Sequence, residues 1–121
     1  MKVQQLLIDS VKPEYRYVVR VYISGFKNAE ELTRDDFEYA TRVAYGRVYQ
    51  FGYFTVNKKI YIDIEFNCGI NAAELEKRKP KFETKCNEMN SHFIPTLHSD
   101  PKVQAALVAK MADLTFEWEE I

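Results

Sequence analysis

The same short pattern follows two strand-like segments of this chain and constrains how it can fold. Residues 28–32 read Asn-Ala-Glu-Glu-Leu, and residues 71–75 read Asn-Ala-Ala-Glu-Leu. The alternating apolar positions of residues 19–23 and 62–66 precede them at the same offset. An Asn with Glu three places later is a helix-capping signature, because both side chains can bond free N–H groups at a helix start. We therefore expect two related strand–turn–helix units. The alternative is chance, since these residue types are common at helix starts.

Hydrophobic periodicity extends this pattern to the whole chain. A short helix is expected before residue 13, and the remaining elements follow in the order β-α-β-β-α-β. The expected elements are strand 15–24, a helix from residue 28 or 33, strands 49–56 and 59–66, a helix from residue 71 that Pro80 interrupts or kinks, a helix from residue 101 capped by Asp100, and strand 114–119. This order predicts a ferredoxin-like α+β fold with a four-stranded antiparallel sheet and helices on one face. The predicted strand order is 4-1-3-2, in a single domain of residues 1–121.

Composition narrows the classes of protein that fit. The chain has 121 residues, is 46% hydrophobic and has a net charge of −1. Such a chain can fill a core, and its charge does not favour nucleic acid or an acidic membrane as a partner. Two cysteines form no disulfide framework, so we expect a reducing, cytoplasmic setting. The first residues lack the features of a signal peptide, and no apolar run reaches the roughly 20 residues that span a bilayer, so no membrane association is expected.

In the predicted fold, one face of the sheet is left without helices, and this face holds the candidate binding residues. They are Arg16, Arg20, Tyr22, Tyr61, Asp63 and Glu65, with Glu117 and Glu119 on the last strand and Tyr49 or Tyr53 on the edge strand. Aromatic side chains surrounded by charge are typical of protein-binding surfaces. The acidic balance favours a protein partner with a basic surface, or a second copy in a homodimer. The alternatives are a solvated ladder of ion pairs, and tyrosines packed beneath the N-terminal helix or the loop of residues 91–101.

Two of these strands resemble those of RNA-recognition motif domains. Residues 21–26 are similar to the short first-strand motif of that family, and residues 59–66 take the place of its third-strand octamer. The resemblance implies that RNA bases would stack on Tyr22 and Tyr61. Ile60 and Ile62 stand where the family has small residues, and Asp63 stands where it has a second aromatic residue. The carboxylates of the face would repel phosphates, which disfavours nucleic acid.

No catalytic motif is recognisable in the sequence. Cys68 is the strongest reactive candidate, because it follows a strand and precedes the helix start at Asn71, where the helix dipole lowers a thiol pKa. His92 or His98 could act as its base. The alternative is a small buried residue at a strand end. Zinc is disfavoured because Cys68 and Cys86 are too far apart for a standard site. A divalent ion on the acidic residues of the sheet is disfavoured by the arginines beside them.

The sequence therefore predicts a protein that binds another macromolecule without catalysis, cofactor or metal. Such a protein would be an inhibitor, an adaptor or an accessory subunit. Short chains rich in Lys, Asn and Tyr and without motifs are similar to proteins of phages and other mobile elements, many of which block host enzymes or defence systems. Two alternatives stay open: a degenerate RNA-binding module on the same sheet face, and a small-ligand-binding protein or enzyme that uses Cys68.

Overall fold

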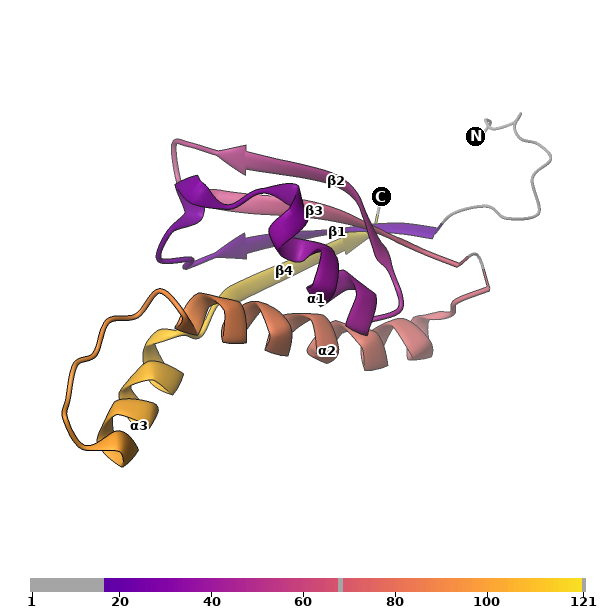
Figure 1. Ribbon diagram of the computed structural model, residues 1–121. Helices are drawn as coiled ribbons and strands as arrows, with labels where there is room; N and C mark the ends of the chain where they lie inside the picture. The colour runs from indigo at the N-terminus through magenta and orange to yellow at the C-terminus, as the bar shows by residue number, and fades with distance from the viewer. Residues whose placement is uncertain (1–16, 68, 121) are drawn as a thin grey trace.

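A computed structural model describes residues 17–67 and 69–120 as an α+β structure with one antiparallel sheet (Figure 1). The sheet has four strands in the order β2-β3-β1-β4, which confirms the predicted neighbours and is consistent with a ferredoxin-like fold. The elements are β1 (Tyr17–Ser24), η1 (Ala29–Glu31), η2 (Arg34–Phe37), α1 (Glu38–Val43), β2 (Arg47–Phe54), β3 (Lys59–Phe66), α2 (Ala72–Ser91), α3 (Pro101–Met111) and β4 (Thr115–Glu120). The predicted N-terminal helix, Arg16 and Cys68 lie outside the described residues.

The core lies between the sheet and the two helices that cover it, α1 and α2 (Figure 1). Successive side chains of a strand point to opposite faces, so the alternating buried residues of β1 and β3 point toward these helices. The side chains that fill this layer include Val19, Val21, Ile23, Ile60, Ile62, Ile64, Phe37, Phe82 and Cys86, all fully or almost fully buried. Burial of each large aliphatic or aromatic side chain contributes roughly 1.5–3 kcal/mol. This layer therefore fixes which strand residues remain on the opposite face.

The two copies of the repeated pattern, residues 28–32 and 71–75, differ in whether their Asn side chain caps a helix. Asn71 caps α2 as predicted, because its Oδ1 accepts a hydrogen bond from the Glu74 backbone N–H at 2.8 Å. Asn28 makes no such bond, and its Oδ1 is buried without a hydrogen-bond partner among the described residues. Instead, the Thr33 backbone N–H donates to the Asp36 carboxylate at 2.6 Å, in a capping box that precedes α1. The prediction of two equivalent Asn caps is therefore wrong, whereas the alternative start at Thr33 is confirmed.

Helix α2 continues through Pro80, contrary to the predicted interruption. Proline removes one backbone hydrogen bond and crowds the preceding turn, which costs about 3 kcal/mol in an isolated helix interior. Three residues on the inner face of α2, namely Leu75, Phe82 and Cys86, are buried in the core on both sides of the proline. Their burial offsets the local cost, so tertiary packing overrides the helix-breaking tendency.

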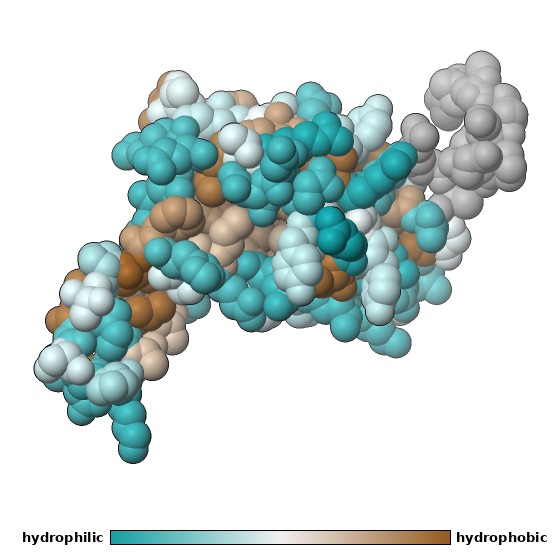
Figure 2. All heavy atoms as spheres, viewed as in Figure 1, coloured by the Kyte–Doolittle hydropathy of each residue, from teal (hydrophilic) through white to brown (hydrophobic). Residues whose placement is uncertain are grey.

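Helix α3 projects from the end of α2, away from the sheet (Figure 1). The fully buried Asn90 of α2 fixes the C-terminal end of α3 against the rest of the fold. Asn90 Nδ2 donates to the Ala112 carbonyl at 3.0 Å, and Asn90 Oδ1 accepts from the Lys27 backbone N–H at 2.9 Å. The Gln104 side chain accepts from the Leu97 N–H at 2.7 Å and so ties the preceding loop to the helix. Over α3, Figure 2 shows hydrophobic residues interspersed with hydrophilic ones.

Candidate functional site: the open face of the sheet

The sheet face opposite α1 and α2, called the open face below, is built from aligned residues of all four strands. Strand register places residues of neighbouring strands side by side in rows that cross the sheet. One row consists of Gly52, Tyr61, Tyr22 and Glu117, and the next consists of Gln50, Asp63, Arg20 and Glu119. The structure therefore brings together the predicted residues Arg20, Tyr22, Tyr61, Asp63 and Glu65 on one face, as the alternation of the strands indicated.

Three rings form a continuous aromatic row on the open face: Phe54, Tyr61 and Tyr22. The Tyr61 ring centroid lies 5.5 Å from that of Phe54 and 6.5 Å from that of Tyr22. Tyr61 lies across β2 at Gly52, where an added Cβ would come within 1.9 Å of the Tyr61 ring. The Tyr61 hydroxyl is held by a hydrogen bond from Gln50 Nε2 at 3.3 Å. Gly52 thus provides the space in which this ring lies against the strand.

Arg20 connects the aromatic row to a buried carboxylate. Its guanidinium donates to both oxygens of Asp63, with Nε–Oδ1 at 2.7 Å and Nη2–Oδ2 at 3.0 Å. The same group lies over Tyr61, with Cζ 4.3 Å from the ring centroid, and Nη1 is 3.5 Å from the Tyr22 hydroxyl. Hydrogen bonding to Asp63, and then to Tyr22, raises the pKa of Arg20, so it is always charged. A bidentate ion pair with a stacked ring fixes the positions of both tyrosines.

The carboxylates of β3 on the open face are buried and form ion pairs with arginines of the neighbouring strands. The alternative of a solvated ladder of ion pairs holds for the pairing but not for the solvation, because Asp63 and Glu65 are only 2% and 5% exposed. Asp63 binds Arg20, and Glu65 forms an ion pair with Arg47 of β2. These carboxylates can be buried because guanidinium groups compensate their charge.

Two carboxylates of β4 remain accessible on the open face. Glu117 pairs with Lys59 at 3.3 Å in an exposed contact. Glu119 is the β4 neighbour of Arg20, but the guanidinium turns to Asp63, and Glu119 has no ion pair within the described part of the chain. The side of the face formed by β4 is therefore acidic.

Strand β2 contributes different residues from those expected. A register shift between Val48 and Gln50 places Tyr49 in a bulge, and beyond it Tyr53 pairs with the inward-pointing Ile60. Tyr53 therefore lies on the helix-covered face, and its predicted place on the open face is wrong. Phe54 takes that place and is 43% exposed.

Several residues that shape the open face were missing from the sequence-based set of candidates: Arg47, Gln50, Gly52, Phe54 and Lys59. A bulge reverses the inward and outward positions of a strand. The only available signal was a glycine in the middle of an aromatic strand, which often marks a close approach of another group.

Other potential sites have weaker chemistry. Cys86 is fully buried, and burial raises the pKa of its thiol well above the usual value, so it stays protonated and inaccessible at neutral pH. Within residues 17–67 and 69–120, no group of three or more His, Cys, Asp or Glu side chains could hold a metal ion.

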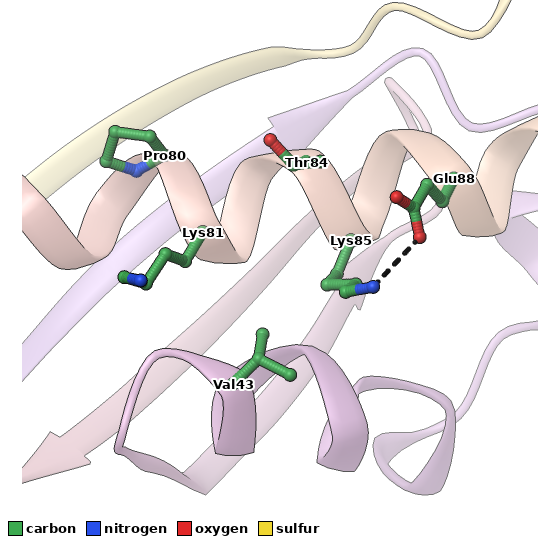
Figure 3. A pocket seen from close by; sticks show the side chains of 6 residues that line it. All are labelled: Val43, Pro80, Lys81, Thr84, Lys85 and Glu88. Carbon is green, nitrogen blue, oxygen red and sulfur yellow. Dashed lines mark hydrogen bonds and ion pairs between the residues drawn. The ribbon is translucent and has the colours of Figure 1, made fainter.

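A shallow pocket of about 400 Å³ lies between α1 and α2 (Figure 3). Val43 of α1 points toward Lys81 and Lys85 of α2, and Lys85 is paired with Glu88 at 3.2 Å. The pocket is widely open, whereas ligand sites are usually concave and bury most of the ligand surface.

Comparison with family models, curated proteins and solved structures gives no match. Among the described helices, none has both the length and the apolar composition needed to cross a membrane.

Proposed function

We propose that this chain is a non-catalytic, cytoplasmic protein of ferredoxin-like fold that binds another protein through its open face. It would act as an inhibitor, an adaptor or an accessory subunit. The observation that carries the proposal is the aromatic row of Phe54, Tyr61 and Tyr22 with Arg20 stacked on it. Tyrosine and arginine are the residues most often found at the energetic centre of protein interfaces.

Rigidity of the open face supports binding. Tyr61 is held by Gly52 below it, Gln50 at its hydroxyl and Arg20 above it. A side chain that is already fixed loses little conformational entropy on association, and a loss of about 0.5–1.5 kcal/mol per mobile side chain is avoided. An unrestrained surface tyrosine would lack this advantage.

The charges of the face indicate the chemistry of the partner. Asp63 and Glu65 are already neutralised by arginines, so they add little attraction. On β4, Glu119 remains available beside Arg20, and Glu117 beside Tyr22 is exposed although it pairs with Lys59. A partner would therefore place apolar or aromatic groups on the aromatic row and a basic group near β4.

Affinity capture from the native host, using the tagged full chain, tests this proposal. The double variant Tyr22→Ala/Tyr61→Ala should lose the captured partner. Tyr39→Ala/Tyr45→Ala is the matched control, because both of these tyrosines are more than half exposed and lie outside the sheet. If the open-face variant folds and retains every partner of the unmodified chain, the proposal is wrong.

One observation favours single-stranded RNA as a second candidate. The Asp63 carboxylate is neutralised by Arg20, and Lys59 Nζ lies 5.8 Å from the Tyr22 ring centroid, so stacked bases would meet less repulsion than the sequence indicated. Binding through phosphates weakens steeply with salt. Titration of single-stranded RNA at several salt concentrations should give salt-sensitive binding that Tyr61→Ala abolishes. The absence of such binding removes this candidate.

A further inference from the structure

We infer that the open face binds a second copy of this chain, face to face, about a two-fold axis parallel to the strands. The inference rests on the proposed function, because it takes the open face to be a protein-binding surface and names the protein. It follows from how charge and aromatic residues are distributed across the rows of the sheet.

The open face has unlike edges. The β2 edge carries Arg47, whose side chain pairs with Glu65 of β3 but stays 66% exposed. The β4 edge carries the carboxylates of Glu119 and of Glu117, which pairs with Lys59 in an exposed contact. Between these edges lie the two tyrosines of the aromatic row. A surface with opposite charges at its two edges is complementary to itself when one copy is reversed from edge to edge.

A two-fold axis parallel to the strands makes this reversal, because it places β4 of each copy over β2 of the other. Each row of residues that crosses the sheet of one copy then faces the same row of the other copy, in reverse order. Tyr61 of one copy faces Tyr22 of the other, and Glu119 faces Gln50 beside Arg47. No two like charges oppose one another in these two rows. The two tyrosines lie on the central strands β3 and β1, near the middle of the interface, where residues contribute most.

The other face-to-face arrangement is less favourable. A two-fold axis perpendicular to the strands would keep β4 over β4 and place Glu117 against Glu119 of the second copy. Opposed like charges disfavour that arrangement.

Edge-to-edge pairing is also hindered. On β2, the Val48 carbonyl already accepts from Arg34 Nη2 at 2.7 Å, and β4 ends in glutamates. Charged residues on edge strands are a common barrier to such pairing.

The size of the face fits a dimer. Three of its strands have 8 residues and the fourth has 6. At about 4.8 Å between strands and about 3.3 Å per residue, such a face covers roughly 500 Å² before side-chain relief is counted. Two such faces give roughly 1,000 Å² in total, which is about the smallest area expected of a specific protein–protein interface.

Sedimentation equilibrium of the full chain tests the existence of the dimer. We expect twice the chain mass of 14.2 kDa. Tyr61→Glu should weaken the dimer by at least about tenfold, since it places a charge at the centre of the interface. Tyr39→Glu, on the helix-covered side, should leave the dimer unchanged. Circular dichroism confirms that both variants are folded. A monomer at every concentration, or a dimer that Tyr61→Glu does not weaken, overturns the inference.

Crosslinking tests the direction of the axis. The variants Gln50→Cys and Glu119→Cys are made in a Cys68→Ser background, in which the only other cysteine is the fully buried Cys86. They are treated with a bismaleimide that spans about 10 Å, the usual spacing of packed sheets. The mixture should crosslink, whereas Glu119→Cys alone should not, because its two copies lie at opposite edges. Self-crosslinking of Glu119→Cys, or no crosslinking of the mixture, contradicts the arrangement. If the chain is monomeric yet its capture of other proteins depends on Tyr22 and Tyr61, the second copy is wrong but the proposed function stands.

Discussion

Among single residues, Arg20 has the central place on the open face. It joins the buried Asp63 carboxylate to Tyr61 and Tyr22, so one guanidinium holds the charge and the rings in one arrangement. Removing one member of such a pair leaves the other partly buried and uncompensated. The stability of the face therefore depends on both members being present.

Asp63→Ala should lower the free energy of unfolding by about 2–3 kcal/mol, measured by urea denaturation. This expected loss is smaller than the loss for a fully buried ion pair, because the Arg20 side chain is still 27% exposed. Glu117→Ala removes the exposed partner of Lys59 and serves as the control, with an expected loss below about 1 kcal/mol. Equal losses in the two variants would show that the Arg20–Asp63 pair has no special place in the fold.

Gly52→Ala should displace the Tyr61 ring, because the new methyl group would occupy the position of that ring. We expect a loss of about 1 kcal/mol or more, and a change in the tyrosine signal of near-ultraviolet circular dichroism. In a Tyr61→Ala background the same substitution should cost little, since the clash is gone. A double-mutant cycle measures this difference. Additive effects would mean that Gly52 and Tyr61 do not constrain each other.

The residue scale also shows what a sequence cannot specify. Asn28 and Asn71 begin the same pattern, yet only Asn71 caps a helix. The pattern is local, whereas the choice of cap depends on what the next turn packs against. Thr33 and Asp36 supplied a competing signal five residues later, and burial of Phe37 favours that helix start. Alternation in β1 and β3 was a stronger signal, since six aligned aliphatic residues leave only one orientation of each strand.

At the scale of elements, α2 shows packing overriding a local preference. Pro80 deprives the carbonyl of Glu76, four residues earlier, of its backbone donor, yet the helix runs from Ala72 to Ser91. Pro80→Ala should restore that hydrogen bond and raise the free energy of unfolding by about 1–2 kcal/mol, after the gain in unfolded-state entropy is deducted. Lys81→Ala, at an exposed neighbouring position, should change it by less than about 0.5 kcal/mol. Lower stability of Pro80→Ala would show that proline is required in this helix.

Asn90 joins three elements, because it bonds the turn after β1 at Lys27 and the end of α3 at Ala112 from within α2. Asn90→Ala should cost about 2–4 kcal/mol by leaving buried backbone groups unsatisfied. Hydrogen exchange should also speed up in residues 101–112. Ser91→Ala, next in sequence but outside this network, is the control. Unchanged exchange in α3 would mean that Asn90 does not hold the arm.

Strand β2 was the element least accessible to prediction. Its aromatic residues identified it as a strand, but the register shift beside Tyr49 exchanged its two faces beyond that point. Consequently Tyr53 and Phe54 took the opposite places from those that simple alternation gives. A bulge depends on cross-strand geometry, and no residue type in this stretch demands one.

For the whole molecule, α+β class, strand order and the sheet face that holds Tyr22 and Tyr61 could be predicted, because they depend on hydrophobic periodicity and short connections. The pairing of charges could not, since Arg20 lies between Asp63 and Glu119 and selects Asp63 only through side-chain geometry. The aromatic row likewise needed Phe54, which the bulge placed there. These unpredicted features turn a charged sheet surface into a rigid one.

Oxidative footprinting by mass spectrometry tests directly whether the open face contacts another protein. The tagged chain is oxidised once in purified form, diluted until it is monomeric, and once in an extract of its host, and then recovered. We expect Tyr22, Tyr61 and Phe54 to be protected in the extract, while Tyr39 and Tyr45 react at the same rate in both. Unchanged reactivity of the aromatic row, or protection confined to Tyr39 and Tyr45, would contradict the account.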